Sequence, residues 1–163
     1  MTPKENRQST ERERALVEIS REYDFPRETV FAMCTDPRKA AKWFLTPQGG
    51  VTVLFELDAR PGCTVRIHGH HGDGHLVRTS GTFLEIVVPE RIVLKTITTP
   101  PEGLPFEAMQ TLKFDELGPE RSRVTVRVKV LAPGSFPGGV DGLEEGFQGG
   151  WEGTLNLLQR ELR

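Results

Sequence analysis

Residues 51–131 form a series of six extended segments, and this series constrains the fold more than any other feature. In the last segment, valines at every second position of Val124–Val130 alternate with polar residues, which is typical of a strand with one dry and one wet face. Every connection between segments contains Gly or Pro, as an antiparallel meander requires. The predicted strands are Val51–Leu57, Thr64–His70, His75–Val87, Arg91–Thr98, Phe106–Phe114 and Arg123–Leu131.

The region before these strands predicts one further strand and two short helices. Apolar and polar residues alternate over Ala15–Phe25, which indicates a half-buried strand. Pro26 suits the first turn of a helix, where its missing N–H is not needed. Asp36 and Pro37 then resemble an N-cap and a first helical residue. The second helix carries Trp43 and ends before the next Pro and Gly residues.

After a loop at Pro133–Gly139, a long amphipathic helix is expected to begin near Asp141–Glu145. A helix over Leu143–Leu162 is about 30 Å long, which matches the width of six or seven strands. The predicted fold class is therefore α+β, with a curved antiparallel sheet of six to seven strands wrapped around the C-terminal helix. The apolar face of this helix consists of Phe147, Trp151, Leu155, Leu158 and Leu162.

Glycines are unusually frequent in this helix, and Gly146, Gly150 and Gly153 share one face. Each glycine inside a helix costs about 1 kcal/mol relative to Ala. Without Cβ atoms, such a face permits close approach of a backbone, a ligand or a neighbouring strand. We favour close approach for Gly150 and Gly153. For Gly146 we favour the alternative that the helix starts late and that this residue belongs to the loop.

The composition excludes several functional classes. The chain has 163 residues and a formal net charge of −2, which argues against a nucleic-acid surface. No apolar run approaches the length needed to span a bilayer, and the N-terminus lacks an apolar signal region. We expect a cytoplasmic protein with a flexible polar tail at residues 1–14 and one domain at 15–163. In that compartment Cys34 and Cys63 are expected to be free thiols.

Four histidines lie in one predicted hairpin, His68 to His75. If the strand is regular, His68 and His70 project from one face and His75 returns across the turn. Imidazole is a common ligand of zinc, nickel and copper, so a metal site is one interpretation. We favour an exposed polar hairpin without metal, because Val65 and Ile67 occupy the core-facing side of the strand.

No nucleophile elbow, phosphate loop, zinc-protease helix or cysteine pair with ligand spacing is present. Glu107 and Gln110 lie on a predicted strand that could face a cavity, so acid–base chemistry remains an alternative. Buried aromatic residues could line such a cavity or simply fill the core. The candidate ligand-binding residues are Trp43, Phe55, Phe83, Phe106, Phe147, Gly150, Trp151 and Thr154.

The order of elements and several residues resemble the Bet v 1-like, START-related superfamily, in particular the subgroup homologous to the activator of Hsp90 ATPase. The resemblance covers Ala15–Leu162. It rests on an opening with Pro26, Val30, Phe31, Thr35, Asp36, Pro37 and Trp43, on Arg60-Pro61-Gly62, on Gly81 with Glu85-Ile86, on Pro89-Glu90-Arg91, and on Gly150-Trp151 with Leu155 and Leu158. The chain departs from the family pattern at Cys63 and in its histidine-rich hairpin.

This resemblance implies the helix-grip fold, with a cavity between sheet and helix. Because relatives bind small apolar molecules, we expect a domain that binds a small hydrophobic molecule. We expect no cofactor, and either a monomer or a homodimer. Two alternatives stay open: a stress-related module that engages a chaperone-like protein partner, and a cyclase or dehydratase acting on an aromatic or polyketide-like molecule. Fold alone does not choose among them.

Overall fold

The computed structural model describes residues 16–44, 50–72 and 74–162. Seven strands form one antiparallel sheet in the order β1-β7-β6-β5-β4-β3-β2. The strands are β1 (Leu16–Tyr23), β2 (Val51–Leu57), β3 (Thr64–His70), β4 (Leu76–Val87), β5 (Arg91–Thr99), β6 (Phe106–Gly118) and β7 (Arg121–Ala132). The helices are α2 (Arg27–Thr35), α3 (Pro37–Ala40) and α4 (Gly139–Glu161). The expected tail at residues 1–14 lies outside the described part of the chain.

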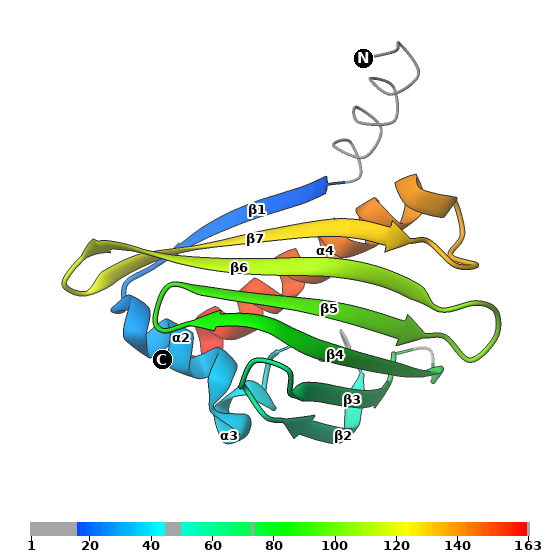
Figure 1. Ribbon diagram of the computed structural model, residues 1–163, viewed down its shortest axis with the longest axis horizontal. Coiled ribbons are helices and arrows are strands. Elements are labelled where there is room, and N and C mark those ends of the chain that lie inside the picture. Colours follow the sequence, from blue (N-terminus) through cyan, green and yellow to red (C-terminus); the bar gives the residue numbers. More distant parts are fainter. Residues whose placement is uncertain (1–15, 45–49, 73, 163) are drawn as a thin grey trace, which may run out of the picture.

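Helix α4 lies across one face of the curved sheet, and α2 and α3 lie beside its C-terminal end (Figure 1). The first strand returns to pair with the last, with Ile19 opposite Val126. The predicted α+β class and helix-grip arrangement are therefore confirmed, with two short helices after the first strand. The strand order places the β3–β4 hairpin, the β5–β6 loop and the β7–α4 loop at one end of the molecule (Figure 1).

The two short helices start at the residues that the sequence indicates. The side chain of Asp36 accepts a hydrogen bond from the backbone N–H of Arg38 at 3.0 Å, and Pro37 occupies the first position of α3. Pro26 is the N-cap of α2 rather than a residue of its first turn. Trp43 follows α3, and its indole N–H donates to the carbonyl oxygen of Met33 at 2.9 Å. This bond folds the segment after α3 back onto α2.

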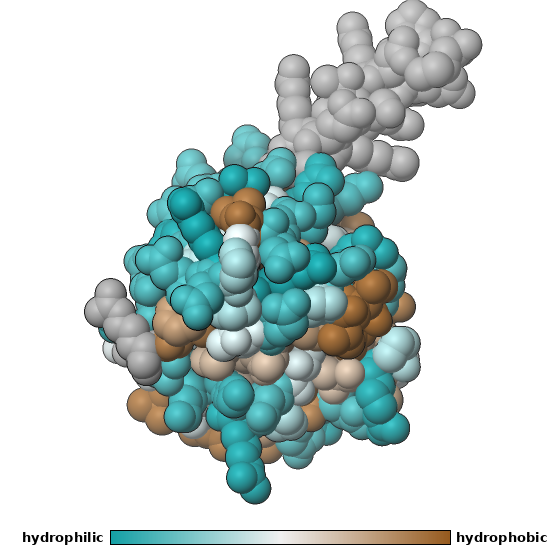
Figure 2. All heavy atoms as spheres, turned by 90° about the vertical axis from the view of Figure 1, so that its left-hand side faces the viewer, coloured by the Kyte–Doolittle hydropathy of each residue, from teal (hydrophilic) through white to brown (hydrophobic). Residues whose placement is uncertain are grey.

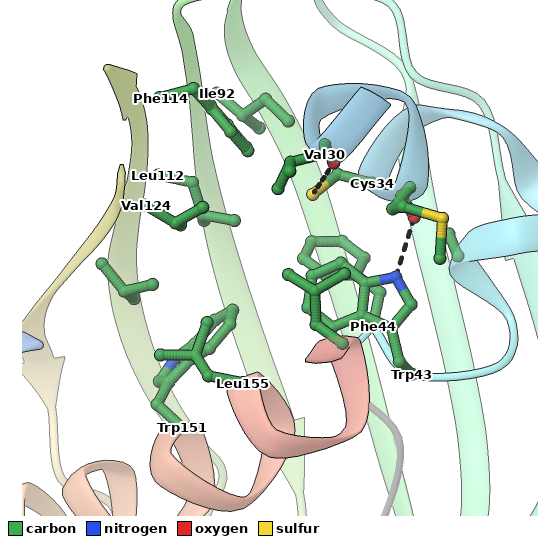
Figure 3. Close-up of a cluster of buried hydrophobic side chains, with 14 of the residues drawn as sticks. Val30, Cys34, Trp43, Phe44, Ile92, Leu112, Phe114, Val124, Trp151 and Leu155 are labelled. Carbon is green, nitrogen blue, oxygen red and sulfur yellow. Dashed lines mark hydrogen bonds between the residues drawn. The ribbon is translucent and has the colours of Figure 1, made fainter. Parts of the chain in front are cut away.

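The main hydrophobic core lies between the sheet, α2 and the C-terminal half of α4. Figure 3 shows Trp151 and Leu155 extending from α4 toward the sheet, where Leu112 and Val124 meet them. A second, smaller cluster lies near the start of α4 around Val130 and Leu143. The described aromatic residues that complete this second cluster are Phe106, Phe136 and Phe147.

The prediction that α4 starts late is wrong. The helix begins at Gly139, so Gly146 lies well inside it. The reason is a close tertiary contact that helix propensity does not reveal: a Cβ atom at Gly142 would lie 2.0 Å from the carbonyl oxygen of Pro137. Glycine lets the first turns pack directly against the preceding loop. The β6–β7 hairpin also extends further than predicted, because pairing continues to Gly118 and Arg121.

Candidate ligand-binding pocket

A pocket of about 780 Å³ opens between the sheet and the N-terminal half of α4. Residues of β3, β4, β5 and β6 form one wall, and α4 forms the other. Loops at the sheet end described above form the mouth. The lining residues are Ile67, Gly69, His71, His75, Val77, Thr79, Thr98, Pro100, Pro101, Glu102, Leu104, Phe106, Gln110, Ser135, Phe136, Pro137, Gly146, Phe147, Gly150, Trp151 and Thr154.

Two loops at the mouth are joined by reciprocal hydrogen bonds. The backbone N–H of Leu104 donates to Ser135 Oγ at 2.9 Å, and the backbone N–H of Ser135 donates to the carbonyl oxygen of Leu104 at 3.3 Å. Gly134 makes this approach possible, because a Cβ atom there would lie 2.3 Å from the carbonyl oxygen of Pro105. We call this contact between the β5–β6 and β7–α4 loops the loop clasp.

Three phenylalanines pack together beside the loop clasp. The ring of Phe106 packs edge-on against Phe136 at 5.6 Å and against Phe147 at 6.0 Å between centroids. Such edge-to-face pairs are a favourable geometry for aromatic rings. They join β6, the β7–α4 loop and α4 into one apolar wall of the pocket.

The helical wall is open because it carries glycine. A Cβ atom at Gly146 would lie 3.2 Å from Phe136 Cζ, whereas one at Gly150 would meet no atom within 4 Å. Close approach to protein thus occurs at Gly146, and Gly150 borders open space. One turn further, Thr154 Oγ1 donates to the carbonyl oxygen of Gly150 at 2.8 Å.

The inner end of the pocket is polar, and a chain of hydrogen bonds links its side chains. The indole N–H of Trp151 donates to Gln110 Oε1 at 2.8 Å, and Gln110 Nε2 donates to Thr96 Oγ1 at 2.9 Å. Thr96 Oγ1 donates in turn to the carbonyl oxygen of Ala108 at 3.5 Å. Gln110 is only 2% exposed. Because the amide is held from both sides, its position is well defined.

Further hydroxyl and charged groups lie closer to the mouth. Thr79 and Thr98 face each other across β4 and β5, with their hydroxyl oxygens 3.1 Å apart. His71, His75 and Glu102 lie in the mouth loops and are exposed. The pocket thus has an apolar body, a neutral polar inner end and ionisable groups at its entrance. This is the usual character of a small-molecule site.

The structure brings most of the predicted site residues together. Phe106, Phe147, Gly150, Trp151 and Thr154 all line the pocket. Trp43, Phe55 and Phe83 do not. Trp43 and Phe83 are fully buried in the main core, and Phe55 packs against its edge. That core also contains Val30 of α2 and Leu155 of α4.

Several lining residues were not among the predicted site residues, although the strand alternation contains a signal for them. Gly69 continues the inward series of Val65 and Ile67 in β3. Thr79 and Thr98 likewise fall on the inward positions of β4 and β5. In this part of the sheet, the small or polar residues at these inward positions border the pocket.

The two polar residues of β6 that could face a cavity differ in their placement. Gln110 lines the pocket, whereas Glu107 is not among the lining residues. Acid–base chemistry by a β6 carboxylate therefore has no support from the lining.

The histidines of the β3–β4 hairpin do not converge. His68 and His70 alternate with the inward residues Ile67 and Gly69, whereas His71 and His75 line the pocket mouth. His70 Nδ1 lies 3.2 Å from the carbonyl oxygen of Gly74. Among the residues that the structure describes, no group of three or more His, Cys, Asp or Glu side chains is placed to hold a metal ion.

Two side chains with strongly displaced pKa values lie in the core, outside the pocket lining. Burial raises the pKa of Tyr23, whose hydroxyl donates to the carbonyl oxygen of Leu155 at 2.9 Å. Burial also raises the pKa of the Cys34 thiol. Both Cys34 and Cys63 are free thiols. The raised pKa values keep Tyr23 and Cys34 neutral at ordinary pH, which suits core packing rather than proton transfer.

A second hollow of about 700 Å³ lies at the other end of the sheet, between α2 and the strands β2 and β4. Its apolar lining includes Phe31, Leu57 and Ile86, with Glu28 and Asp58 at the edge. Figure 2 looks at this end of the molecule, which is mostly hydrophilic with separate hydrophobic patches. Asp58 is engaged by Arg60, whose guanidinium lowers the pKa of that carboxyl.

Comparisons with known proteins agree with the fold. A protein of Chromobacterium violaceum is 24% identical, with a TM-score of 0.72 over 91% of this chain and 97% of that one. A protein of Mycobacterium smegmatis is 16% identical, with a TM-score of 0.75 over 93% of each chain. A protein in the dynemicin biosynthetic locus is 20% identical, with a TM-score of 0.65 over 91% of this chain and 47% of that one. No curated protein matches the chain significantly.

Within the described residues, no helix is long and apolar enough to cross a membrane.

The family model of the activator of Hsp90 ATPase homolog 1-like proteins matches residues 24–163. That match spans α2 to the end of the chain, including every element that forms the pocket. The chain therefore belongs to the activator of Hsp90 ATPase homolog 1-like family.

Proposed function

We propose that this protein binds a small hydrophobic molecule in the pocket between the sheet and α4. The observation that carries the proposal is the open space beside Gly150. Every glycine inside a helix lowers its stability relative to alanine, yet Gly150 relieves no steric contact with protein. Because Gly150 lines the pocket, its missing side chain leaves room there. A volume of about 780 Å³ falls within the range of small-molecule sites.

The lining supports an apolar ligand. The wall formed by Phe106, Phe136 and Phe147 offers aromatic faces and edges, and Ile67 and Val77 add aliphatic surface on the sheet. Transfer of apolar surface from water to such a site is favourable by about 25 cal/mol per Å² buried. Binding therefore follows mainly from exclusion of water.

A titration with the fluorophore N-phenylnaphthylamine, whose emission rises in apolar surroundings, tests the proposal. The full chain is compared with Gly150→Leu and with the matched control Gly149→Leu. Gly149 is exposed and is not a lining residue, and a Cβ atom there would also meet no atom within 4 Å. Both changes gain helix propensity by a similar amount, so only their effects on the pocket differ.

We expect saturable binding to the wild type and to Gly149→Leu. Gly150→Leu should weaken binding by about tenfold or more, which corresponds to about 1.4 kcal/mol of lost interaction. Organic extraction of the protein purified from its native host, followed by mass spectrometry, would identify the natural molecule. Absent binding, or equal affinities of the two leucine variants, would contradict the proposal.

A cyclase or dehydratase activity is a second candidate, favoured by one observation. The Gln110 amide at the inner end is fixed in position and lies beside the pocket, where it could orient a reacting carbonyl group. One structurally similar protein lies in the dynemicin biosynthetic locus. Incubation of aromatic polyketide-like ketones with the protein, analysed for loss of water, tests this candidate. Engagement of a chaperone stays a prediction, tested by pull-down from a lysate.

A further inference from the structure

We infer that the ligand is a neutral, largely apolar molecule with a hydrogen-bond-accepting oxygen, such as a ketone, which Gln110 binds. This inference rests on the proposed function and specifies its ligand class. It comes from the hydrogen bonds at the inner end of the pocket and from the placement of charge around it.

The direction of the Gln110 amide follows from its neighbours. The indole N–H of Trp151 can only donate, so the Gln110 atom 2.8 Å from it must be the acceptor Oε1. The NH₂ group then points toward Thr96 Oγ1 at 2.9 Å. Amide orientation is otherwise ambiguous, but here the Trp151 donor determines it.

This arrangement leaves a donor available to the pocket. The Gln110 Nε2 atom carries two N–H groups, and in the described part of the chain it makes one hydrogen bond, to Thr96. Leaving a buried donor without an acceptor is unfavourable. A ligand oxygen that accepts from this N–H meets the requirement when the ligand displaces water.

The charge distribution favours a neutral ligand. The ionisable lining residues are His71, His75 and Glu102, which are exposed at the mouth. None of the lining residues that the structure describes is Lys or Arg. A carboxylate placed at Gln110 would be buried without a compensating cation, which is strongly unfavourable. A carbonyl group needs only the one donor.

Three probes built on one ring system test the inference: fluorene, fluorenone, and fluorene carrying a carboxylate. Hydrophobic transfer alone favours fluorene over the more polar fluorenone. A preference for the ketone therefore isolates the hydrogen bond. Isothermal titration calorimetry with the full chain gives the affinities, and the infrared carbonyl stretch of bound fluorenone reports hydrogen bonding directly.

We expect fluorenone to bind about three- to tenfold more tightly than fluorene, the ratio that one hydrogen bond of ordinary net strength supplies. The carboxylate should bind more weakly than fluorene. Gln110→Met should abolish the preference for fluorenone, retain fluorene binding and return the carbonyl stretch toward its value in hexane. The surface control Gln148→Met, on an exposed residue of α4, should change none of these.

Gln110→Met leaves the Trp151 indole N–H without its acceptor and so could fail to fold. The double variant Trp151→Phe/Gln110→Met removes that donor too, and Trp151→Phe alone is its reference. Equal affinity for fluorenone and fluorene, or a preference that survives removal of Gln110, would overturn the inference while leaving the proposed function standing. Failure of all three probes and of N-phenylnaphthylamine would instead count against the proposed function.

Discussion

The hydroxyl of Tyr23, at the end of β1, donates a hydrogen bond to the carbonyl oxygen of Leu155 in α4 at 2.9 Å. Tyr23 is only 1% exposed, so this bond is made away from water. It connects the first strand of the sheet to the C-terminal half of α4. The bond therefore helps to fix the position of α4 relative to the sheet. Because α4 forms one wall of the pocket, the bond also helps to position that wall.

Replacing Tyr23 with Phe should lower the free energy of unfolding by about 1 kcal/mol, because a buried hydrogen bond is lost and the ring is retained. Ser20→Ala, in the same strand, is the matched control. Its hydroxyl bonds Thr125 Oγ1 at an exposed position and should contribute far less. Urea denaturation measures both. Equal effects of the two substitutions would contradict the role assigned to Tyr23.

Stability should fall at alkaline pH. The native pKa values of Cys34 and Tyr23 are raised by burial above their ordinary values of 9.0 and 10.0. Above those ordinary values the unfolded chain loses protons that the native chain retains. The stabilisation is therefore complete below about pH 9 and declines as pH rises, by up to about 1.4 kcal/mol per pH unit for each group.

Urea midpoints measured across this alkaline range check the expectation. Cys34→Ala should remove the part of the decline that begins near pH 9, and Tyr23→Phe the part that begins near pH 10. Tyr23 is the single tyrosine of the chain, so tyrosinate absorbance follows its ionisation directly. Identical pH slopes in the wild type and both variants would refute this explanation.

The two thiols should differ in reactivity. Cys63 is partly exposed, whereas Cys34 is buried and its Sγ lies 3.9 Å from the carbonyl oxygen of Val30. Because the thiolate is the reactive form, the raised pKa of Cys34 slows it further. A disulfide reagent such as Ellman's should modify Cys63 in the native protein and Cys34 only after unfolding. Equally fast modification of both thiols would show that the core around α2 opens readily.

The loop clasp should depend on Gly134. Its φ of +56° is unfavourable for other residues, and a Cβ atom would overlap the Pro105 carbonyl oxygen at 2.3 Å. Gly62 has a similar φ of +84° with nothing within 4 Å. Gly62→Ala should lower the free energy of unfolding by about 1–2 kcal/mol, from backbone strain alone. Gly134→Ala should lower the free energy of unfolding by clearly more, because the two loops of the clasp must separate. It should also change the binding of N-phenylnaphthylamine. Equal losses, with binding unchanged, would contradict the clasp.

Much of the sheet is predictable from local pattern. The bounds of β2 and β3 agree with the expected Val51–Leu57 and Thr64–His70, because alternation identifies the strand and Gly or Pro marks its ends. The N-cap at Asp36 is equally local. The start of α4 is not predictable from local pattern, because glycine at position 142 disfavours a helix. Its close contact with the carbonyl oxygen of Pro137 is known only from the structure.

The pocket is predictable only in part, for a physical reason. Alternation separates inward from outward residues, but it does not say whether an inward aromatic meets another side chain or an empty volume. Phe83 and Phe106 both point inward from the sheet. Phe83 is fully buried in the main core, whereas Phe106 packs against Phe136 and Phe147 and also borders the pocket. That difference depends on the curvature of the whole sheet.

The glycine at position 150 has a consequence for how this protein can diversify. The rigid packing that holds the fold together lies around Leu155 and Leu158, further along the same helix. A side chain added at position 150 would extend into unoccupied volume. A single substitution there can therefore reshape the pocket without disturbing the core packing. Under the proposed function, a substitution at position 150 would change the size of the molecule that fits and leave the packing around Leu155 and Leu158 unchanged.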